Sequence, residues 1–432
     1  MRLILTALGS YGDVYPMVGL GAMMRSRGHQ VTVITNPHFQ SAVESVGLEL
    51  LPLGTVQEYD ELTRHPDLWD PIRGPMMILQ LAMKEQLRTL YELIETAYVP
   101  GETVLGAHAL DLASRNFQER HGTPLASIHF APVGLRSFVE SPQMFFMLMT
   151  NRTPVWLRRL QYWLADRLVI DRLLGPSLNA FRAELDLPPV SRVLQRWYFS
   201  PQLVLGLFPD WFASPQPDWP DRTSLTGFPL WDHATDSQKI GSQLLDAQLP
   251  DEVTEFLSGG EPPIVFAPGS AMTQGELFFS AAVEACQQLG RRAILLTKYP
   301  DQLPRELPPT VCHFDFVPFS QLLPRAAAVV HHGGIGSCAQ SLAAGIPQLV
   351  KPMAYDQLDN AQRLRRLGVG QMLRPRHFQG AKVALALDRL LSAPATHEQC
   401  HRYAQKCDGQ AALTTAAEHL ERLETERSEK SG

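Results

Sequence analysis

The feature that most constrains the fold is a short unit at the start of the chain. Residues Leu3 to Leu8 are apolar, a glycine-bearing turn spans Gly9 to Asp13, and Pro16 to Arg27 has a helical period that ends at Gly28. The β-branched run Gln30 to Thr35 follows directly. This order predicts strand, turn, helix and strand, and strands that are joined through a helix are parallel.

The same pattern recurs along the rest of the chain. Further apolar runs span Leu48 to Leu53, Thr103 to Gly106, Leu125 to Phe130, Ile264 to Ala267, Ala293 to Thr297, Val311 to Phe314, Ala328 to His331 and Gln348 to Lys351. A chain of 432 residues exceeds one ordinary hydrophobic core, so two domains are expected. We predict an α/β fold with two Rossmann-like doubly wound domains facing across a cleft, the usual place for a ligand.

The domain boundary follows from a change in composition. The pattern breaks into proline, tryptophan and aspartate near Pro209 and again in Ser214 to Pro220. We therefore expect a first domain at 1–210, a linker at 211–245 and a second domain at 246–405. The charged helical stretch 406–432 is expected to pack back on the first domain.

Composition excludes several classes of protein. Hydrophobic residues make up 45% and charged residues 19% of a chain with net charge −6, which lacks the basic stripe that nucleic acid binding needs. Five cysteines lack C-x-x-C spacing, and clustered ligands for a metal are missing, so free thiols and no metal site are expected.

No secretion signal and no membrane-spanning run is recognised, because the first residues already have the pattern of a strand and no apolar run approaches 18 residues. We expect a cytoplasmic protein, with peripheral membrane contact left open and the oligomeric state unassigned.

The densest chemical signal is the segment His331 to Ser337, which reads H-H-G-G-I-G-S. It follows a buried-strand pattern and leads into a helix. Glycines let a ligand approach the backbone, and a helix N-terminus offers N–H groups to a phosphate. His332 adds an imidazole and Ser337 a hydroxyl, so this loop is a candidate diphosphate site.

Two more loops are expected at the same edge of the sheet. Asp356 and Gln357 follow the run Gln348 to Lys351, and Gly269 and Ser270 follow Ile264 to Ala267. A carboxylate beside an amide suits sugar hydroxyls, which both donate and accept hydrogen bonds. The carboxyl edge of an α/β sheet is where ligands bind.

These motifs resemble the donor domain of the inverting UDP-glycosyltransferase-like enzymes of GT-B fold, especially the bacterial antibiotic, macrolide and sterol glucosyltransferase-like branch. The resemblance implies that a loop at Phe316 to Pro324 meets the nucleotide base, although many relatives carry Trp or Tyr at the position of Phe316 and Gln at that of Phe319. The donor-binding residues that it implies are Gly269, Ser270, Phe316, Val317, His332, Gly334, Gly336, Ser337, Asp356 and Gln357.

The segment Gly9 to Pro16 resembles the G-S-x-G-D-V-x-P loop of the same branch. Plant-type relatives carry a histidine in this loop, so the resemblance makes Asp13 the candidate general base. Ser10, Tyr11 and Phe130 are expected to contact the acceptor. The function implied is transfer of a hexose, from UDP-glucose or a related UDP- or dTDP-sugar, to a small hydrophobic acceptor, without metal or cofactor.

Plainer interpretations remain open for several residues. Asp13 could cap a helix that starts near Pro16, and Asp356 could cap a helix over Gln357 to Leu367. His108 and His129 lie at the ends of expected strands and could face the cleft, although a place in the core or on the surface is preferred. The Met-rich stretches Met76 to Met83 and Met144 to Met149 are assigned to ordinary core slightly ahead of acceptor contact.

Competing functions are a nucleotide-sugar epimerase of the same architecture and a catalytically silent nucleotide-sugar-binding protein. An enlarged first domain disfavours the epimerase, and the presence of Asp13, His332 and Asp356 disfavours the silent protein. A nicotinamide dehydrogenase is disfavoured because the first turn lacks G-x-G-x-x-G.

Overall fold

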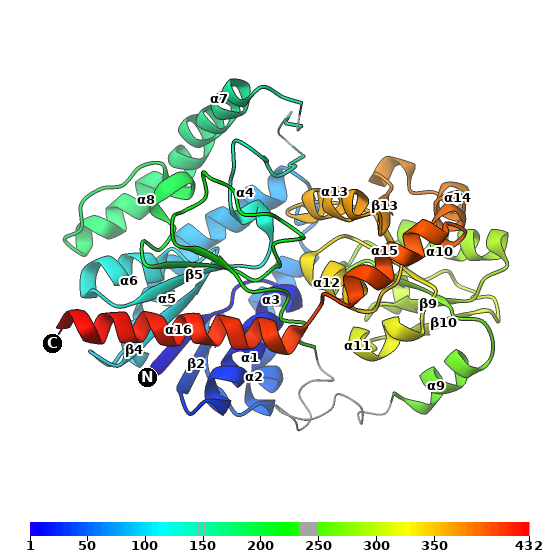
Figure 1. Ribbon diagram of the computed structural model, residues 1–432, viewed down its shortest axis with the longest axis horizontal. Helices are drawn as coiled ribbons and strands as arrows, with labels where there is room; N and C mark the ends of the chain where they lie inside the picture. The colour runs from blue at the N-terminus through cyan, green and yellow to red at the C-terminus, as the bar shows by residue number, and fades with distance from the viewer. Residues whose placement is uncertain (146, 148, 151, 233–248, 432) are drawn as a thin grey trace. The chain divides into compact units, whose positions relative to one another are not determined.

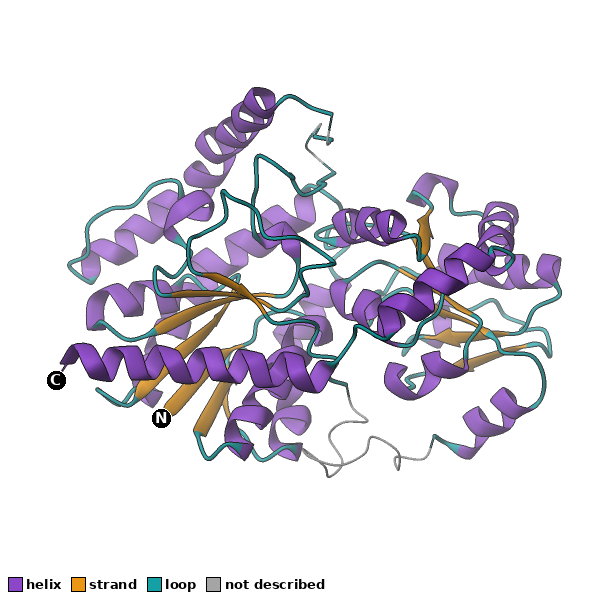
Figure 2. Cartoon of the chain, in the orientation of Figure 1, coloured by secondary structure: helices purple, strands orange, loops and turns teal. Residues whose placement is uncertain are grey.

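The computed structural model describes residues 1–145, 147, 149–150, 152–232 and 249–431, and the chain divides into two compact units. Unit 1 comprises Met1–Gly9, Asp13–Pro229 and Gly409–Gly432, and unit 2 comprises Ser10–Gly12 and Leu230–Asp408. Each unit has its own parallel sheet with helices against it (Figure 2). The predicted α/β class is confirmed.

Unit 1 is built on a sheet whose described strands number seven, in the order β3-β2-β1-β4-β5-β6-β7, and every neighbouring pair is parallel. The strands are β1 (Arg2–Thr6), β2 (Gln30–Thr35), β3 (Glu49–Pro52), β4 (Thr103–His108), β5 (Leu125–His129), β6 (Leu203–Gly206) and β7 (Thr223–Leu225). The chain leaves β1 in one direction and returns to its other side at β4, so a switch point lies between these two strands.

The helices of unit 1 follow the strands and cover the sheet (Figure 1). They are α1 (Tyr11–Ser26), α2 (Gln40–Ser45), α3 (Val56–Arg64), α4 (Arg73–Leu81), α5 (Leu87–Ala97), α6 (Ala113–His121), α7 (Val155–Ala165), α8 (Asp171–Glu184) and α16 (Gly409–Ser431), with π-helical turns η2 (Ala82–Gln86), η4 (Asp166–Ile170) and η5 (Val193–Trp197). Across the described residues, no helix is both long and apolar enough to span a membrane.

Unit 2 repeats the architecture with six described strands in the order β10-β9-β8-β11-β12-β13. The strands are β8 (Ile264–Ala267), β9 (Ala293–Leu296), β10 (Val311–Phe314), β11 (Ala328–His331), β12 (Gln348–Val350) and β13 (Gly370–Met372). The helices are α9 (Asp251–Ser258), α10 (Glu276–Leu289), α11 (Phe319–Leu322), α12 (Ile335–Ala343), α13 (Gln357–Leu367), α14 (Gly380–Leu391) and α15 (Pro394–Ala404). Here the switch point lies between β8 and β11.

Both faces of the unit 2 sheet are buried, which explains why its strands are continuous apolar runs. Ile264 and Phe266 of β8 belong to one hydrophobic cluster with α10 and α14. Val265 and Ala267 of the same strand belong to a second cluster that includes Val253 of α9. Alternate side chains of a strand point to opposite faces, so helices must cover both.

The structure differs from the expected boundaries at the linker. Residues 211–229 belong to unit 1, because β7 pairs with β6 and extends the sheet. Residues 233–245 of the expected linker, and 246–248 after it, lie outside the described residues. The strands β6, β7 and β13 were not anticipated. β7 (Thr-Ser-Leu) and β13 (Gly-Gln-Met) have no apolar run, and β6 lies next to the stretch in which the pattern breaks up.

The first helix also begins earlier than expected, at Tyr11 rather than near Pro16. Gly9 has φ +123°, a conformation open to glycine, and the chain turns there directly from strand to helix. Asp13 therefore lies in the first turn of α1. Its interpretation as a cap before Pro16 was wrong.

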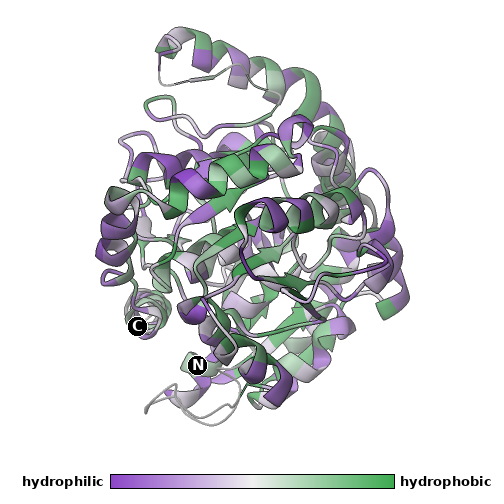
Figure 3. Ribbon diagram, turned by 90° about the vertical axis from the view of Figure 1, so that its right-hand side faces the viewer, coloured by the Kyte–Doolittle hydropathy of each residue, from purple (hydrophilic) through white to green (hydrophobic). Residues whose placement is uncertain are grey.

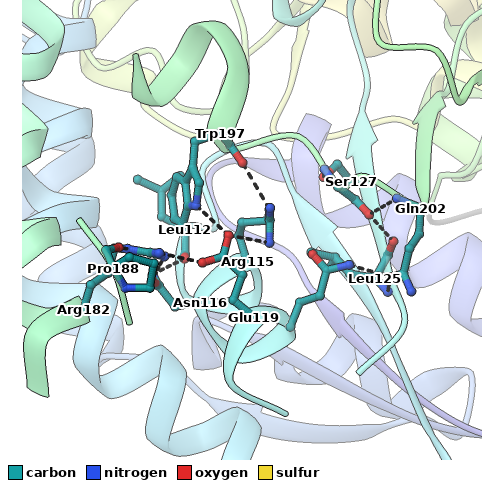
Figure 4. Close-up of polar contacts among 12 residues, drawn as sticks. Leu112, Arg115, Asn116, Glu119, Leu125, Ser127, Arg182, Pro188, Trp197 and Gln202 are labelled. Carbon is teal, nitrogen blue, oxygen red and sulfur yellow. Dashed lines mark hydrogen bonds and ion pairs between the residues drawn. The ribbon is translucent and has the colours of Figure 1, made fainter. Parts of the chain in front are cut away.

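A buried polar network fastens α8 to α6 (Figure 4). Arg182, only 1% exposed, donates to Asn116 Oδ1 at 2.9 Å, Glu119 Oε2 at 2.6 Å and the carbonyl of Pro188 at 2.8 Å. The indole N–H of Trp197 donates to the second oxygen of Glu119 at 2.9 Å. Because a buried guanidinium needs such partners, this network fixes the helical region that follows β5.

The C-terminal helix α16 packs within unit 1. Its apolar stripe is buried at Leu413, Ala416, Ala417, Leu420 and Leu423. At the rim, Arg27 donates to both carboxylate oxygens of Glu421, at 2.8 and 2.7 Å, and His29 Nε2 lies 2.9 Å from Glu421 Oε1. These bonds, led by that from Arg27, lower the pKa of Glu421 to about 2.

We predict that Glu421→Gln destabilises the folded chain by about 1 kcal/mol at neutral pH, the size expected for a partly exposed pair. The ordinary pKa of glutamate is 4.5, so the contribution is fully present above that value and is lost as pH falls towards 2. Thermal unfolding of wild type and variant from pH 7 to pH 3 should show a gap that closes on acidification. The control Glu418→Gln removes an exposed contact with Arg422 inside α16 and a weaker charge interaction with Arg27, so its effect should be smaller, and an equal effect of both variants would contradict the prediction.

Candidate active site

Three predicted loops of unit 2 meet at one edge of its sheet. β8, β11 and β12 are adjacent and parallel, so the segments after Ala267, His331 and Val350 leave the sheet at neighbouring carboxyl ends. They carry Gly269 and Ser270, His332 to Ser337, and Asp356 and Gln357. The site therefore lies at the switch point, where ligands bind in open α/β sheets.

The loop after β11 forms a tight turn into α12. Gly333 has φ +98°, and a Cβ built on it would lie 2.6 Å from Val350 Cγ1 and 3.1 Å from the carbonyl of Gln357. Gly334 is the N-cap of α12, and Gly336 and Ser337 lie in its first turn. First-turn N–H groups have no partner within their helix and attract anions.

His331 supports this turn from beneath. It is fully buried, and its Nδ1 accepts from the N–H of Gly333 at 3.1 Å. The proton of the neutral ring is therefore assigned to Nε2, which donates to Gln348 Oε1 at 3.0 Å. Burial lowers the pKa of His331 to about 4. Both ring nitrogens thus hold the loop in place.

His332 is half-buried between two glycines. A Cβ built on Gly269 would lie 3.1 Å from the ring, and one on Gly334 would lie 2.5 Å from Nε2. From the sequence, these glycines are expected to let a ligand approach the backbone, whereas in the structure the imidazole itself requires them. Burial, and secondarily His331, lower the pKa of His332 to about 3, so the ring is neutral near pH 7.

Asp356 holds the start of a different helix from the one expected. It occupies the N-cap position of α13, but its side chain makes no capping bond there. Instead Oδ2 accepts from the N–H of Ile335, the first residue of α12, at 3.2 Å and from Asn360 Nδ2 at 2.7 Å. Asp356 is thus at the N-cap position of Gln357 to Leu367, as the capping interpretation has it, but its side chain bonds to the start of α12 instead. Its carboxylate bridges the two loops.

Gln357 is 2% exposed, and its Oε1 accepts from the N–H groups of Met353 and Ala354 at 2.7 and 3.1 Å. These bonds shape the loop in which Tyr355 has φ +55°, a left-handed conformation that is uncommon outside glycine. Strain of this kind concentrates at functional sites. Gln357 thus positions the segment that carries Asp356.

The remaining donor residues lie further along the same edge. Phe316, two residues after β10, has 45% of its surface exposed, whereas Val317 is buried in the core of unit 2. Ser270 is exposed. An exposed phenyl ring at a strand end is available to stack on a flat ligand, while the side chain of Val317 is not.

In unit 1 the loop after β1 and the end of β4 bring Asp13 and His108 together. His108 Nε2 lies 3.5 Å from Asp13 Oδ1, an electrostatic contact longer than a good hydrogen bond. His108 Nδ1 accepts from the N–H of Leu110 at 3.1 Å, which assigns the proton to Nε2, facing Asp13. The side chain of Asp13 is 35% exposed and that of His108 only 5%, so the carboxylate is the accessible member of the pair.

Further contacts fix this pair. Gly9 packs under the carboxylate, because a Cβ there would collide with Asp13 Oδ2. The backbone N–H of His108 donates to Thr6 Oγ1 at 3.0 Å, and that hydroxyl donates to Asp111 Oδ2 at 2.8 Å. Buried Asp111 also accepts from the N–H of Ser114 at 2.8 Å, which holds the turn after β4.

The predicted acceptor residues lie at the same strand ends. Ser10 and Tyr11 are half-buried at the start of α1. Phe130 follows β5, is buried, and has its ring centroid 5.3 Å from that of His108. Met147 and Met149 are buried against Tyr162 of α7, as core residues are.

Asn360 and Tyr355 were not identified from the sequence. His108 was placed in the core or on the surface ahead of the cleft, although its position at a strand end was a recognised reason to consider the cleft. A lone histidine gives no signal of its partner, and the contact with Asp13 is seen only in the structure. Asn360 lies four residues after Asp356 on α13, a helical spacing that places the two side chains together.

Comparisons with known proteins agree with this geometry. The Glycosyltransferase family 28 N-terminal domain matches residues 3–113, and the Erythromycin biosynthesis protein CIII-like C-terminal domain matches residues 292–423. The O-mycaminosyltylonolide 6-deoxyallosyltransferase of Streptomyces fradiae is 32% identical over 382 residues, which cover 85% of this chain and 84% of that protein.

Solved structures agree on the fold. The glycotransferase of kitacinnamycin has a TM-score of 0.73 at 22% identity, covering 98% of each chain. Glycosyltransferase VinC in complex with dTDP has a TM-score of 0.66 at 18% identity, covering 99% of this chain and 100% of that one. The fold is that of the GT-B glycosyltransferases. The chain belongs to their UDP-glycosyltransferase-like family and is a glycosyltransferase.

We predict that Gly333→Ala destabilises the fold more than Gly290→Ala. Both glycines have positive φ, +98° and +62°, but only at Gly333 would the new methyl group meet neighbours. The control should lose about 1–2 kcal/mol from backbone strain, and Gly333→Ala about 1–3 kcal/mol more from overpacking. Urea unfolding of both variants measures the difference, and equal losses would show that the turn tolerates a side chain.

Proposed function

We propose that this glycosyltransferase is inverting and metal-independent and moves a hexose from a UDP- or dTDP-sugar to a hydroxyl of a small hydrophobic acceptor. Asp13 is the general base. The observation that carries the proposal is the Asp13–His108 pair, in which an accessible carboxylate is oriented by an imidazole whose two nitrogens are both in use. His108 is thus unsuited to be the base itself, and acts as a positioning residue.

The chemistry follows from these groups. Asp13 takes the proton of the acceptor hydroxyl. At the same time the oxygen of that hydroxyl attacks the anomeric carbon from the side opposite the diphosphate. The bond from that carbon to the diphosphate oxygen breaks, and its electron pair leaves with the diphosphate. The configuration at the anomeric carbon of the sugar is therefore inverted. The first turn of α12, Ser337 and the imidazole of His332 stabilise the leaving group by hydrogen bonds, the role that we assign to them in place of a metal ion.

The relatives bear on the identity of the substrates. One solved neighbour carries dTDP, and the Streptomyces fradiae relative is named for transfer of a 6-deoxyallosyl group to O-mycaminosyltylonolide. These names favour an apolar acceptor such as a polyketide, sterol, flavonoid or lipid, and they favour dTDP-sugars as much as UDP-glucose. Phe316 is the residue that we assign to stacking on the base.

Incubation with radiolabelled UDP- and dTDP-sugars tests the proposal. Hydrophobic alcohols and phenols form one acceptor panel, and oligosaccharides form the other. Transfer to the first panel with inverted anomeric configuration is expected, and transfer confined to oligosaccharides would show that the apolar acceptor is wrong. Isomerisation without transfer would instead support an epimerase, and binding without turnover a silent protein; the family names favour neither.

We predict that Asp13→Asn lowers kcat by about two to four orders of magnitude with donor affinity nearly unchanged, because it removes only the base. His108→Ala should lower kcat by about 10- to 100-fold through loss of orientation, and His108→Gln, which keeps a donor, should recover much of it. Asp221→Asn, at an exposed aspartate of unit 1, is the matched control. Near-normal turnover of Asp13→Asn would refute the assignment.

We predict that His332→Ala weakens binding of both the nucleoside diphosphate and the nucleotide sugar, whereas Asp356→Asn weakens only the nucleotide sugar. The asparagine keeps an oxygen for the N–H of Ile335 and so preserves the loop, but loses the charge that accepts sugar hydroxyls. Calorimetry with each nucleotide and its sugar measures the split. Asp388→Asn, at an exposed aspartate of α14, is the control, and equal weakening by Asp356→Asn would mean that Asp356 is structural only.

A further inference from the structure

The helix α7 and the adjoining turn η4 carry an unusual exposed surface. Seven of the thirteen large hydrophobic residues that are exposed in the described part of the chain lie between 155 and 169. Trp156 is 67% and Trp163 57% exposed. The others are Val155, Leu160, Leu164, Leu168 and Val169. Contiguous exposed apolar patches on a folded protein indicate a surface that binds something.

The inward side of the same helix is polar, the reverse of an ordinary amphipathic helix. Arg158, Tyr162 and Asp166 follow at intervals of four residues and are all buried. Arg158 donates to the carbonyls of Phe138 and Val139 at 3.1 and 2.5 Å. Asp166 accepts from Arg136 at 2.6 Å. These bonds fix α7 with its apolar side outward.

Tyr162 completes the inner side by packing on Met147 and Met149. The uppermost helix of Figure 1 is α7, and in Figure 3 it carries green and purple residues side by side. Its exposed apolar face is therefore a fixed part of unit 1 and not a loose end. Within the described residues, no segment of the chain covers this face.

The charged side chains around these apolar residues indicate what kind of partner the surface binds. Arg152, Arg159, Arg167 and Arg172 are exposed around the apolar residues. In the fully described stretch 152–172 the two carboxylates are not exposed: Asp166 is bound to Arg136, and Asp171 accepts from the N–H groups of Arg192 and Val193. The exposed charges of this stretch are therefore all cationic, on a chain whose net charge is −6.

We propose that α7 and η4 bind the surface of a bilayer that contains anionic lipid. Tryptophan is enriched at the level of lipid headgroups, leucine enters the acyl boundary, and arginine extends to the phosphates. A second copy of the chain fits less well, because a two-fold contact through this face would place its arginines against the same arginines. The proposal does not depend on the base or the substrates assigned above.

Co-sedimentation with vesicles tests it, using phosphatidylcholine alone and phosphatidylcholine mixed with phosphatidylglycerol. The wild type should bind the mixed vesicles and bind phosphatidylcholine at least tenfold more weakly. Each arginine near an anionic surface contributes about fivefold, so Arg159→Gln with Arg167→Gln should weaken binding by about 25-fold. Raising the salt from about 0.1 M to 1 M shortens the Debye length from about 10 to 3 Å and should have a similar effect.

The decisive variant is Trp156→Glu with Trp163→Glu, which should lose vesicle binding while thermal unfolding stays unchanged, because both side chains are exposed. The matched control is Leu277→Glu, at an 80% exposed leucine of α10 in unit 2, and it should bind like wild type. Failure of the wild type to bind anionic vesicles, or equal binding by the tryptophan variant, would overturn the proposal. So would a dimer in sedimentation velocity that the tryptophan variant abolishes, since the face would then join two copies.

Discussion

Parallel pairing of strands is the constraint from which the candidate site of each unit follows. A parallel strand must be reached through a crossover, and every loop that begins a crossover leaves the sheet at its carboxyl edge. Where the chain turns from one side of the first strand to the other, two such loops diverge and leave room between them. In unit 1 these loops carry Asp13 and His108, and in unit 2 Ser270 and His332. In both units the loops at the carboxyl edge of a parallel sheet carry the polar side chains, but the side chains differ between the units.

Within each loop the polar residues divide into those that hold and those that act. His331 and Gln357 are buried. His331 accepts a hydrogen bond from the backbone of the glycine-rich turn, and Gln357 accepts from the backbone of the segment before α13. Thr6 and Asp111 do the same behind His108. The partly exposed side chains, Asp13, His332 and Phe316, are the ones to which the proposed function gives contact with ligands. A residue's degree of exposure here separates the two roles better than its place in a motif.

The sequence was sufficient to predict the fold class, since short apolar runs that alternate with helical stretches are typical of parallel α/β sheets. It was also sufficient for motifs that lie within one continuous stretch of chain. It was not sufficient where a partner comes from another strand. Asp13 and His108 are 95 residues apart, and only the sheet order β1-β4 makes them neighbours. The bond from Ile335 to Asp356 crosses from one loop to the next for the same reason. β7 was missed because its residues, Thr-Ser-Leu, do not form an apolar run, whereas the equally short β12 lies in one.

The loop between β11 and α12 attracts an anion less strongly than a helix N-terminus with a charged histidine would. Its imidazole is neutral, with a pKa near 3, and a carboxylate already occupies the N–H of Ile335 at the start of α12. Both facts reduce the attraction for an isolated diphosphate. They also have a use, because the carboxylate of Asp356 is fixed by Ile335 and Asn360 in a position to accept from sugar hydroxyls. Under the proposed function, part of the affinity for the donor would come from the sugar, so its transfer would favour release of the nucleoside diphosphate.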